Sequence, residues 1–306
     1  MTDERLRVFE AQRPHLLGIA YRMLGEMGAA EDLAQEAWLR WQRAAGEDIR
    51  DPRAWLSAVT VRLALDALRK ARARRETYIG PWLPEPLLPD DMRALAADAP
   101  AARAELASDL SLALLHVLER LSPEERAALI LHDAFDCDYD VIAQTLEKNE
   151  AACRKLVSRA RERVKAERPR HSVPSEKHRA LLANFLTAAA TNNLDSITHL
   201  LASDVVLYSD GGGKVAAALN PIFGADKVTR FTAGVIRKFG PVDGITLEPA
   251  EISGAPGYLL RTAEGLHSAL TVEVDGDVIS AIYLVRNPDK LRRVATSPSP
   301  GSFPSA

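Results

Sequence analysis

Apolar side chains recur at helical spacing through the first part of the chain. Residues 16–24 form one apolar stripe, which Gly25 ends, and residues 30–41 form a second with apolar positions every three to four residues. A third helix is expected to begin at Asp51 and Pro52, because aspartate caps helices and proline fits their first turn. The pattern predicts an all-helical domain.

A second helical block covers residues 104–166. Ser122, Pro123 and Glu125 have the order of a capped helix start, with serine as N-cap and glutamate completing a capping box. A short helix, a three-residue turn and a longer helix capped by Asn149 follow. This spacing predicts a helix-turn-helix.

The pattern changes after residue 176, where one or two helices, at residues 180–190 and 194–201, lead into apolar runs typical of strands. Asp275 and Gly276 separate two such runs and predict a hairpin. This part reads as an α+β domain with an antiparallel sheet.

Residues 78–91 connect the first two blocks and contain four prolines, which exclude a continuous helix or a central strand. The chain is therefore divided into five parts: residues 1–76, a proline-rich linker 77–103, residues 104–170, residues 176–293 and a tail 294–306 expected to be disordered.

Composition excludes several classes of protein. No run of eighteen apolar residues is present and the N-terminus is charged, so we expect neither a membrane span nor a signal peptide, and a cytoplasmic location. Two cysteines, Cys137 and Cys153, cannot form a disulfide framework or a four-ligand zinc site and are expected to be buried. No metal or cofactor is predicted.

Charge is segregated along the chain despite a formal net charge of −3. Residues 62–75 carry six basic residues and one acid, residues 154–170 carry eight and two, and residues 85–109 between them carry six acids and two arginines. Solvated helix faces would account for such runs, but two basic helices with an acidic spacer also suit a protein that binds a polyanion at two places.

The second helix has a polar face opposite its apolar stripe, made of Asp32, Gln35, Glu36 and Leu39. An ordinary solvated face would mix in more basic residues at i, i+4 spacing, so an acidic stripe with one leucine also suits a docking surface.

Three stretches carry a family resemblance: "AEDLAQEAWLRW" at residues 30–41, "DPRAWLSAVTVRLALDALRKARARR" at residues 51–75, and "LSPEERAALILHDAFDCDYDVIAQTL" at residues 121–146. Together they resemble regions 2 and 4 of extracytoplasmic-function (ECF) RNA polymerase sigma factors. "WLPEPL", "DGGGK" and "NPDKL" resemble, more narrowly, the subgroup with a C-terminal SnoaL-like extension. The resemblance implies a region 2 helical bundle, a region 4 helix-turn-helix and a cone of curved antiparallel sheet closed by helices.

That resemblance implies core RNA polymerase and promoter DNA as partners. It places polymerase contacts on Asp32, Gln35, Glu36 and Leu39, and contacts to the −10 element on Arg62, Asp66, Arg69 and Lys70. Asp66 shares a helix face with Arg62 and Arg69 and is suited to orienting them.

The −35 element would be read by the helix that Asn149 caps. Arg154 is near its N-terminal end, where arginine can reach guanine, and Glu150 can accept from a cytosine amino group. The full set is Glu150, Arg154, Lys155, Ser158, Arg159 and Arg161. Glu147 departs from the family pattern, because glycine is common at that place in the turn.

The subgroup resemblance implies that the linker lies against the extension, with Trp82 as an anchor. The implied contact residues are Trp82, Leu83, Pro84, Glu85, Pro86, Asp210, Gly211, Gly212, Gly213, Lys214, Asn287, Pro288, Asp289 and Lys290. "DGGGK" also fits a plain turn; as a contact loop, it would let Asp210 and Lys214 pair with the linker or the DNA-reading domains.

The predicted function is promoter-specific transcription initiation, tuned by the chain's own C-terminal domain and without catalysis. The alternative is a helix-turn-helix regulator fused to a cone domain that binds a small molecule or acts as a cyclase or isomerase. Its candidate pocket groups are His199, Asp204, Tyr208, Asp210 and His267, whose mutual placement the sequence does not give. An unidentified small ligand of this domain therefore stays open as a partner.

Overall fold

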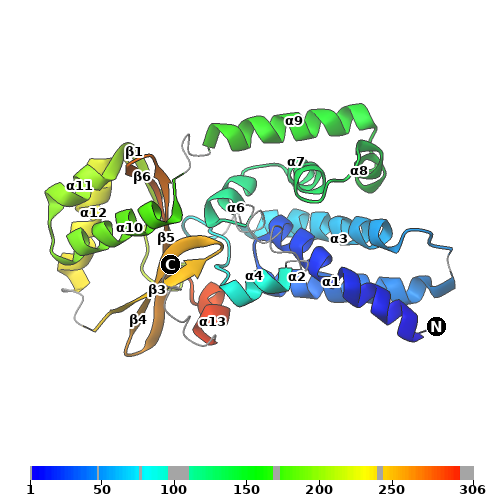
Figure 1. The fold of residues 1–306 in the computed structure, drawn as a ribbon, viewed down its shortest axis with the longest axis horizontal. Coiled ribbons are helices and arrows are strands. Elements are labelled where there is room, and N and C mark those ends of the chain that lie inside the picture. The colour runs from blue at the N-terminus through cyan, green and yellow to red at the C-terminus, as the bar shows by residue number, and fades with distance from the viewer. Residues whose placement is uncertain are drawn as a thin grey trace. The chain divides into compact units, whose positions relative to one another are not determined.

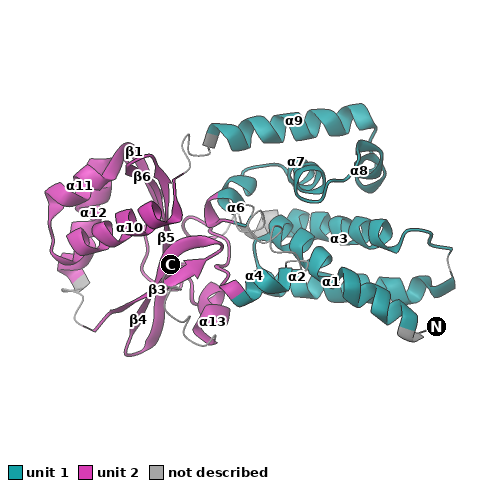
Figure 2. Cartoon of the chain, viewed as in Figure 1, with its two compact units in different colours: residues 1–77, 90–110, 114–168 teal, residues 78–89, 111–113, 169–306 magenta. Residues whose placement is uncertain are grey.

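The computed structural model describes residues 2–46, 48–75, 78–95, 110–167, 173–239 and 244–296, and the chain forms two compact units (Figures 1 and 2). Unit 1 contains residues 1–77, 90–110 and 114–168, and unit 2 contains residues 78–89, 111–113 and 169–306. The first part of the linker therefore belongs to the same unit as the C-terminal domain.

Unit 1 begins with the predicted helical bundle. Its elements are α1 (Thr2–Leu24), α2 (Met27–Arg43), the short 3₁₀ turn η1 (Ala44–Gly46) and α3 (Pro52–Arg75). Gly25 ends α1 with a φ of +72°, which glycine adopts without strain. The Asp51 carboxylate accepts from the Ala54 amide at 3.0 Å, so the predicted cap of α3 is confirmed. Apolar side chains from the three helices meet in a core that includes Phe9, Leu16, Trp41 and Leu56.

The linker contains one short helix, α4 (Pro89–Leu95). The second helical block follows the linker, and its elements are α6 (Leu112–Leu118), α7 (Pro123–Leu129), the π-helical turn η2 (Ile130–Ala134), α8 (Tyr139–Leu146) and α9 (Glu150–Glu167). The capping box of Ser122 and Glu125 is present. The chain stays helical toward Phe135 as expected, but the π turn at its end carries no signal in the apolar period.

Unit 2 holds helices α10 (Ser175–Ala190), α11 (Leu194–Leu200), α12 (Ala225–Phe239) and α13 (Pro288–Thr296). Its strands are β1 (Leu201–Asp210), β2 (Ile222–Phe223), β3 (Thr246–Ile252), β4 (Ala255–Thr262), β5 (Gly265–Asp275) and β6 (Val278–Val285). They form a sheet in the order β2-β1-β6-β5-β4-β3.

The predicted antiparallel sheet needs one correction, because β1 and β6 are parallel while the other neighbouring strands pair antiparallel. Sequence pattern identified strands but not the partner of β1, which lies far away in sequence. The predicted hairpin is formed by β5 and β6, with Asp275 opposite Val278, so Gly276 and Asp277 are its loop residues. Register shifts within three of the strand pairs are the bulges that bend such a sheet.

Each face of the sheet is covered by a separate apolar layer. Helices α10, α11 and α12 pack on one face, around Leu182, Phe185, Ile197 and Val228 (Figure 1). The other face is covered by Leu83, Leu88 and Leu112 together with Leu291 and Val294 of α13. Linker leucines are therefore part of the core of this unit.

Two element ends differ from the boundaries expected from sequence. Helix α13 continues to Thr296, with Val294 fully buried, beyond the expected boundary at residue 293. The linker was expected to contain no helix, but α4 begins at Pro89 within it. Proline fits the first turn of a helix, and the three earlier prolines of the linker lie before this helix. Linker residues 96–103 and tail residues 297–306 lie outside the described part of the chain.

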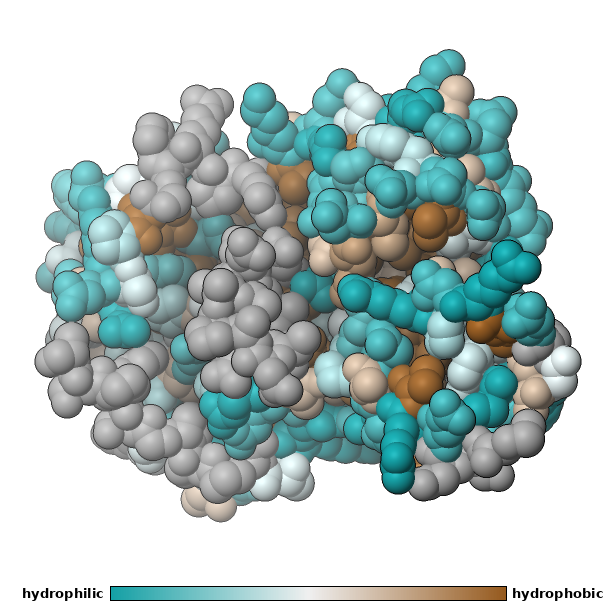
Figure 3. Space-filling model, turned by 45° about the vertical axis from the view of Figure 1, so that its right-hand side comes forward, coloured by the Kyte–Doolittle hydropathy of each residue, from teal (hydrophilic) through white to brown (hydrophobic). Residues whose placement is uncertain are grey.

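The outer surface of the view in Figure 3 is mostly hydrophilic, with hydrophobic residues in small groups. No helix among the described residues is long and apolar enough to cross a membrane. Cys153 is buried as expected, whereas Cys137 is half-buried, and burial raises the pKa of both thiols.

Candidate polymerase, promoter and linker contact sites

The acidic face predicted on α2 is present. Asp32 and Gln35 are exposed, and Leu39 is 37% exposed. Glu36 is half-exposed and pairs with Arg40 at 3.1 Å. Such an exposed i, i+4 pair contributes only about 0.3–0.5 kcal/mol, so it leaves the Glu36 carboxylate able to meet another cation.

The candidate −10 residues on α3 are also exposed, but they fall into two groups. Asp66 accepts from Arg69 at 3.1 Å, as expected for an orienting carboxylate. Arg62 instead donates to backbone carbonyls of α8, those of Gln144 at 3.1 Å and Thr145 at 3.3 Å. Its guanidinium is thus occupied by the helix-turn-helix and not by Asp66.

The turn between α8 and α9 has glutamate at a position where the backbone is left-handed, a conformation that glycine adopts more easily. Glu147 adopts a left-handed φ of +56°, and the amide of Lys148 bonds to the Ala143 carbonyl at 3.0 Å. Asn149 accepts from the Ala152 amide at 2.8 Å and caps α9 as predicted. The motif therefore forms with some backbone strain at Glu147.

Helix α9 buries Cys153, Val157, Ala160 and Val164 and presents its polar residues outward. All of the candidate −35 residues are exposed: Glu150, Arg154, Lys155, Ser158, Arg159 and Arg161. Glu150 pairs with Arg154 at 2.6 Å, which holds this arginine on the outer face.

Buried Glu125 ties α9 to α7. It pairs with Arg163 at 2.8 Å and with Arg159 at 3.4 Å. Burial raises the pKa of Glu125, but hydrogen bonds from Ser122 and the nearby arginines outweigh that effect and lower the pKa overall. Arg159 thus has a partner within the protein in addition to any role at DNA.

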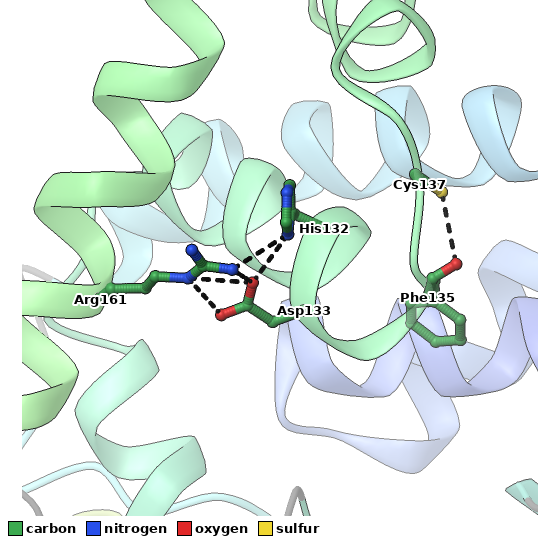
Figure 4. A network of polar contacts seen from close by, with 5 residues as sticks. All are labelled: His132, Asp133, Phe135, Cys137 and Arg161. Atoms are coloured by element: carbon green, nitrogen blue, oxygen red, sulfur yellow. Dashed lines mark hydrogen bonds and ion pairs between the residues drawn. The ribbon is translucent and has the colours of Figure 1, made fainter.

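Sequence reasoning missed a cluster beside α9 (Figure 4). Asp133 of η2 holds the Arg161 guanidinium by bonds of 2.5 to 3.2 Å, which raises the pKa of Arg161, and His132 contacts both side chains at 3.0 and 3.1 Å. The His132 ring packs on Tyr139, whose ring also lies 5.0 Å from the Arg154 guanidinium. No motif marks these residues, because the π turn that presents Asp133 breaks the helical period.

A hollow of about 240 Å³ lies on this side of α9. Val157 and the Tyr139 ring are among its lining, with Arg154, Ser158, Arg161 and Lys165 also around it. This combination of cations, a hydroxyl and an apolar surface suits a phosphodiester backbone with an adjacent base edge.

In unit 2, the linker and the extension meet at one buried carboxylate. Asp210 ends β1 and is fully buried. One of its oxygens accepts from the Tyr78 hydroxyl at 2.6 Å and the Gly212 amide at 3.0 Å, and the other accepts from the Leu83 amide at 2.9 Å and the Lys290 ammonium at 2.7 Å. Four donors satisfy this carboxylate in a site without solvent contact.

Lys290 comes from "NPDKL" and is 5% exposed. Besides Asp210, its ammonium donates to the Leu83 carbonyl at 2.5 Å and lies 3.9 Å from the Trp82 ring centroid. Trp82 is only partly buried, so the anchor predicted at this position acts through a cation–π contact, while Leu83 supplies the fully buried side chain.

The glycines of "DGGGK" are required by their surroundings. Gly212 and Gly213 have φ of +61° and +70°. A Cβ on Gly212 would lie 2.3 Å from the Asn287 amide nitrogen, and one on Gly213 would lie 2.9 Å from Ile79. Asn287 also donates to the Tyr78 hydroxyl at 2.9 Å, so residues of all three short motifs converge with Tyr78.

Lys214 does not reach the linker. It pairs with Asp289 on the exposed surface, which lowers the pKa of Asp289. The two charged residues of "DGGGK" thus have different partners. Asp210 bonds to the linker and to Lys290, whereas Lys214 pairs with Asp289 at the surface.

Further along the linker, Leu87 and Ser253 exchange two hydrogen bonds, at 2.7 and 3.1 Å. Leu87 is fully buried, Pro84 and Pro86 are buried, and Glu85 is 8% exposed with Arg293 at 4.0 Å. Exposed Pro288 begins α13. Gly211 is buried, and a Cβ there would lie 2.5 Å from the Val215 carbonyl.

The groups proposed for a catalytic pocket do not converge. His199 and Asp204 are exposed, and Tyr208 stacks on Tyr283 within the apolar layer that includes linker leucines. His267 contacts Arg286 at 2.7 Å. A hollow of about 410 Å³ beside α10 and α11 includes His199 in its lining but none of the other four groups.

Comparison with known proteins agrees with this architecture. Residues 8–74 match the Sigma-70 region 2 family and residues 111–164 match the Sigma-70 region 4 family. The ECF RNA polymerase sigma factor SigJ of Mycobacterium tuberculosis is 41% identical over 294 residues, covering 92% of this chain and 91% of the relative. Probable ECF RNA polymerase sigma factor SigI of the same species is 32% identical, covering 92% and 93%.

A crystal structure of M. tuberculosis SigJ is similar to the whole fold, with a TM-score of 0.73, 36% identity, and coverage of 94% of this chain and 98% of that one. The match includes the C-terminal domain as well as both helical regions. This chain belongs to the ECF RNA polymerase sigma factors, promoter-specific transcription initiation factors, in the subgroup that carries a C-terminal extension.

Proposed function

We propose that this sigma factor docks on core RNA polymerase through the exposed face of α2. Its two carboxylates would meet basic residues of the polymerase, and Leu39 would fill the apolar centre of the contact. The acidic character of this exposed face carries the proposal, because carboxylates such as Asp32 and Glu36 complement basic groups on a partner, and Leu39 between them adds apolar contact area.

Promoter recognition would be divided between the two helical regions. Arg69, Lys70 and Arg62 of α3 would contact the −10 element, with Asp66 orienting Arg69. In α9, Arg154 would read a base edge, and Lys155, Arg159 and Arg161 would bind phosphates. Glu150 would act mainly by holding Arg154, to which it is already paired.

The C-terminal domain would regulate this activity through the linker. The buried Asp210 carboxylate carries this part of the proposal, because it bonds to the linker at Tyr78 and Leu83 and to Lys290 of the extension. A linker held this way takes a fixed path along the domain, which limits how the two DNA-reading regions can be placed on a promoter. The proposal requires neither a small ligand nor a catalytic step in this domain.

The experiment measures binding to purified core polymerase and promoter-dependent transcription by the full chain. Asp32→Arg combined with Glu36→Arg should abolish core binding, because it turns two attractions into repulsions. The matched control is Glu4→Arg with Glu10→Arg, two exposed acids on α1. Loss of binding in the control alone, or in neither variant, would refute the assignment of the α2 face.

Regulation through the linker is tested by Tyr78→Phe, which removes one hydroxyl from the Asp210 site without changing the shape of the side chain. Transcription by the reconstituted holoenzyme should change while the affinity for core stays within a few-fold. Lys214→Ala, which breaks only the exposed pair with Asp289, is the control. Equal transcription by wild type and Tyr78→Phe would count against the linker as the regulatory element.

A further inference from the structure

Within unit 1, the two promoter-reading regions contact one another. Helix α3 packs against α7 and α8, and α1 packs against α7 and η2. Among the described residues, Arg126 of α7, Phe135 after η2 and Arg62 of α3 make polar or aromatic contacts between the regions.

Arg126 is buried in this contact, being 2% exposed. It donates to the Met23 carbonyl in the last turn of α1 at 2.6 Å and to Glu119 at 2.6 Å. A cation at the C-terminal end of a helix is favoured by the helix dipole. Burial lowers the pKa of Arg126 to about 9, so the side chain remains charged at neutral pH.

Phe135 packs on α1, where it contacts His15 and Arg22. Its ring lies 4.6 Å from that of His15, edge to face, and 5.1 Å from the Arg22 guanidinium. Gly18 lies under the ring, since a Cβ at that position would be 3.4 Å from Phe135, an ordinary van der Waals distance. Region 4 thus inserts an aromatic side chain against the region 2 bundle.

Arg62 makes the third contact, at the C-terminal end of α8, whereas Phe135 precedes the N-terminal end of that helix. The carbonyls of Gln144 and Thr145 that accept from it lie in the last turn of α8, and Glu147 is 3.8 Å away. Arg62 is still 47% exposed. The contact is therefore shallow, unlike that of Arg126, and exchanging one set of acceptors for another costs little desolvation.

We propose that the α3 surface around Arg62 has two mutually exclusive partners: the C-terminal end of α8 in the same chain, and the −10 strand of promoter DNA. The same guanidinium donors serve both, because backbone carbonyls and DNA phosphates or base edges are alternative acceptors. Arg126 and Phe135 hold region 4 in place, and Arg62 is the residue whose partner changes. This inference rests on the proposed −10 role of α3.

A closed unit 1 lowers the apparent affinity for any partner that needs the regions apart. The apparent dissociation constant rises by the inverse of the open fraction. If core polymerase binds the open arrangement, substitutions that weaken the contact between the regions will tighten binding to core without touching the polymerase surface on α2.

The test compares Arg62→Ala with Arg69→Ala in the full chain. Both remove a candidate −10 arginine from α3, but only Arg62 contacts region 4. Hydrogen exchange of residues 15–23 and 126–147, followed by mass spectrometry, should be faster in Arg62→Ala than in wild type, and core binding should be several-fold tighter. Arg69→Ala should match wild type in both measurements.

Phe135→Leu provides an independent variant, chosen over alanine to preserve an apolar side chain at this site. It should also speed exchange in these segments and tighten core binding. In wild type, addition of core polymerase should speed exchange in the same segments. No such change on adding core, or identical behaviour of Arg62→Ala and Arg69→Ala, would overturn the inference. Failure of wild type to bind core would instead refute the proposed function.

Discussion

The Lys290 ammonium lies 2.7 Å from a carboxylate oxygen of Asp210, and the two side chains are 5% and 0% exposed. Eighty residues separate them in sequence. Both also bond to the linker segment at Leu83, so this buried ion pair joins the end of β1, the start of α13 and the linker.

Breaking this ion pair should be costly. Asp210→Asn leaves the buried Lys290 charge without its counter-ion, and removal of one partner of a buried pair typically destabilises a protein by about 3–5 kcal/mol. Chemical denaturation should detect a fall of this size. The double variant Asp210→Asn with Lys290→Met should recover part of the loss, because no unpaired charge remains; no recovery would mean that the two charges do not act as a pair.

Two glycine positions should respond in opposite directions to alanine. Gly212→Ala requires a left-handed backbone and places a Cβ against Asn287, so we expect a loss of about 1–3 kcal/mol. Gly234→Ala, in α12 with open space around it, should stabilise the chain by about 0.5–1 kcal/mol. Thermal unfolding distinguishes them, and a neutral Gly212→Ala would contradict the described loop.

Asp133 should strengthen DNA binding although it is an acid. On a promoter selected from a random library by the wild-type holoenzyme, Arg161→Ala should weaken binding about tenfold, or ~1.4 kcal/mol. It should also reduce the slope of log affinity against log salt by about 0.9. Asp133→Asn should weaken binding less and leave the slope unchanged, because it frees Arg161 without removing its charge. Tighter binding by Asp133→Asn would show that Asp133 only repels DNA.

The free energy of unfolding should decrease as the pH is lowered below neutral, partly because of His15. Burial, together with the charges of Arg53 and Arg22, lowers the pKa of His15 from 6.5 to about 4. The unfolded chain therefore binds a proton between pH 6.5 and 4 that the folded chain does not, and stability drops across that window by up to ~3 kcal/mol. The pH profile of unfolding free energy should be flatter in His15→Gln, which removes the titrating group; parallel profiles for the two proteins would contradict the assignment. Comparing the two isolates His15 from His178 and His267, whose pKa values burial also lowers.

Much of the local structure was predictable because its causes are local. The capping box at Ser122, the cap at Asn149 and the stop at Gly25 depend on residues within one helical turn, and the structure confirms all three. The apolar stripe of α9 was predictable because helical period alone decides which face is buried.

Other features depend on residues that meet only after folding. Parallel pairing of β1 with β6 follows from where the strands lie in the sheet, which alternation within a strand does not encode. Likewise, Asp133 meets Arg161 through a π turn, and Arg62 meets α8 across a contact between two regions.

By itself, the sequence determined three folded parts, the helix-turn-helix, the exposed α2 face and the two basic helices, because helix period, capping and charge act over short stretches of chain. The resemblance of its three short motifs to one subgroup of the family also indicated where linker and extension would meet. Only the tertiary structure decided which partner each charged side chain has. Asp210 accepts a hydrogen bond from the linker, whereas Lys214 pairs with Asp289. Arg62 donates to carbonyls of α8, whereas Arg69 donates to Asp66. The physical reason is that a charged side chain pairs with whatever donor or acceptor the fold brings within about 3 Å, and sequence separation places no limit on that choice.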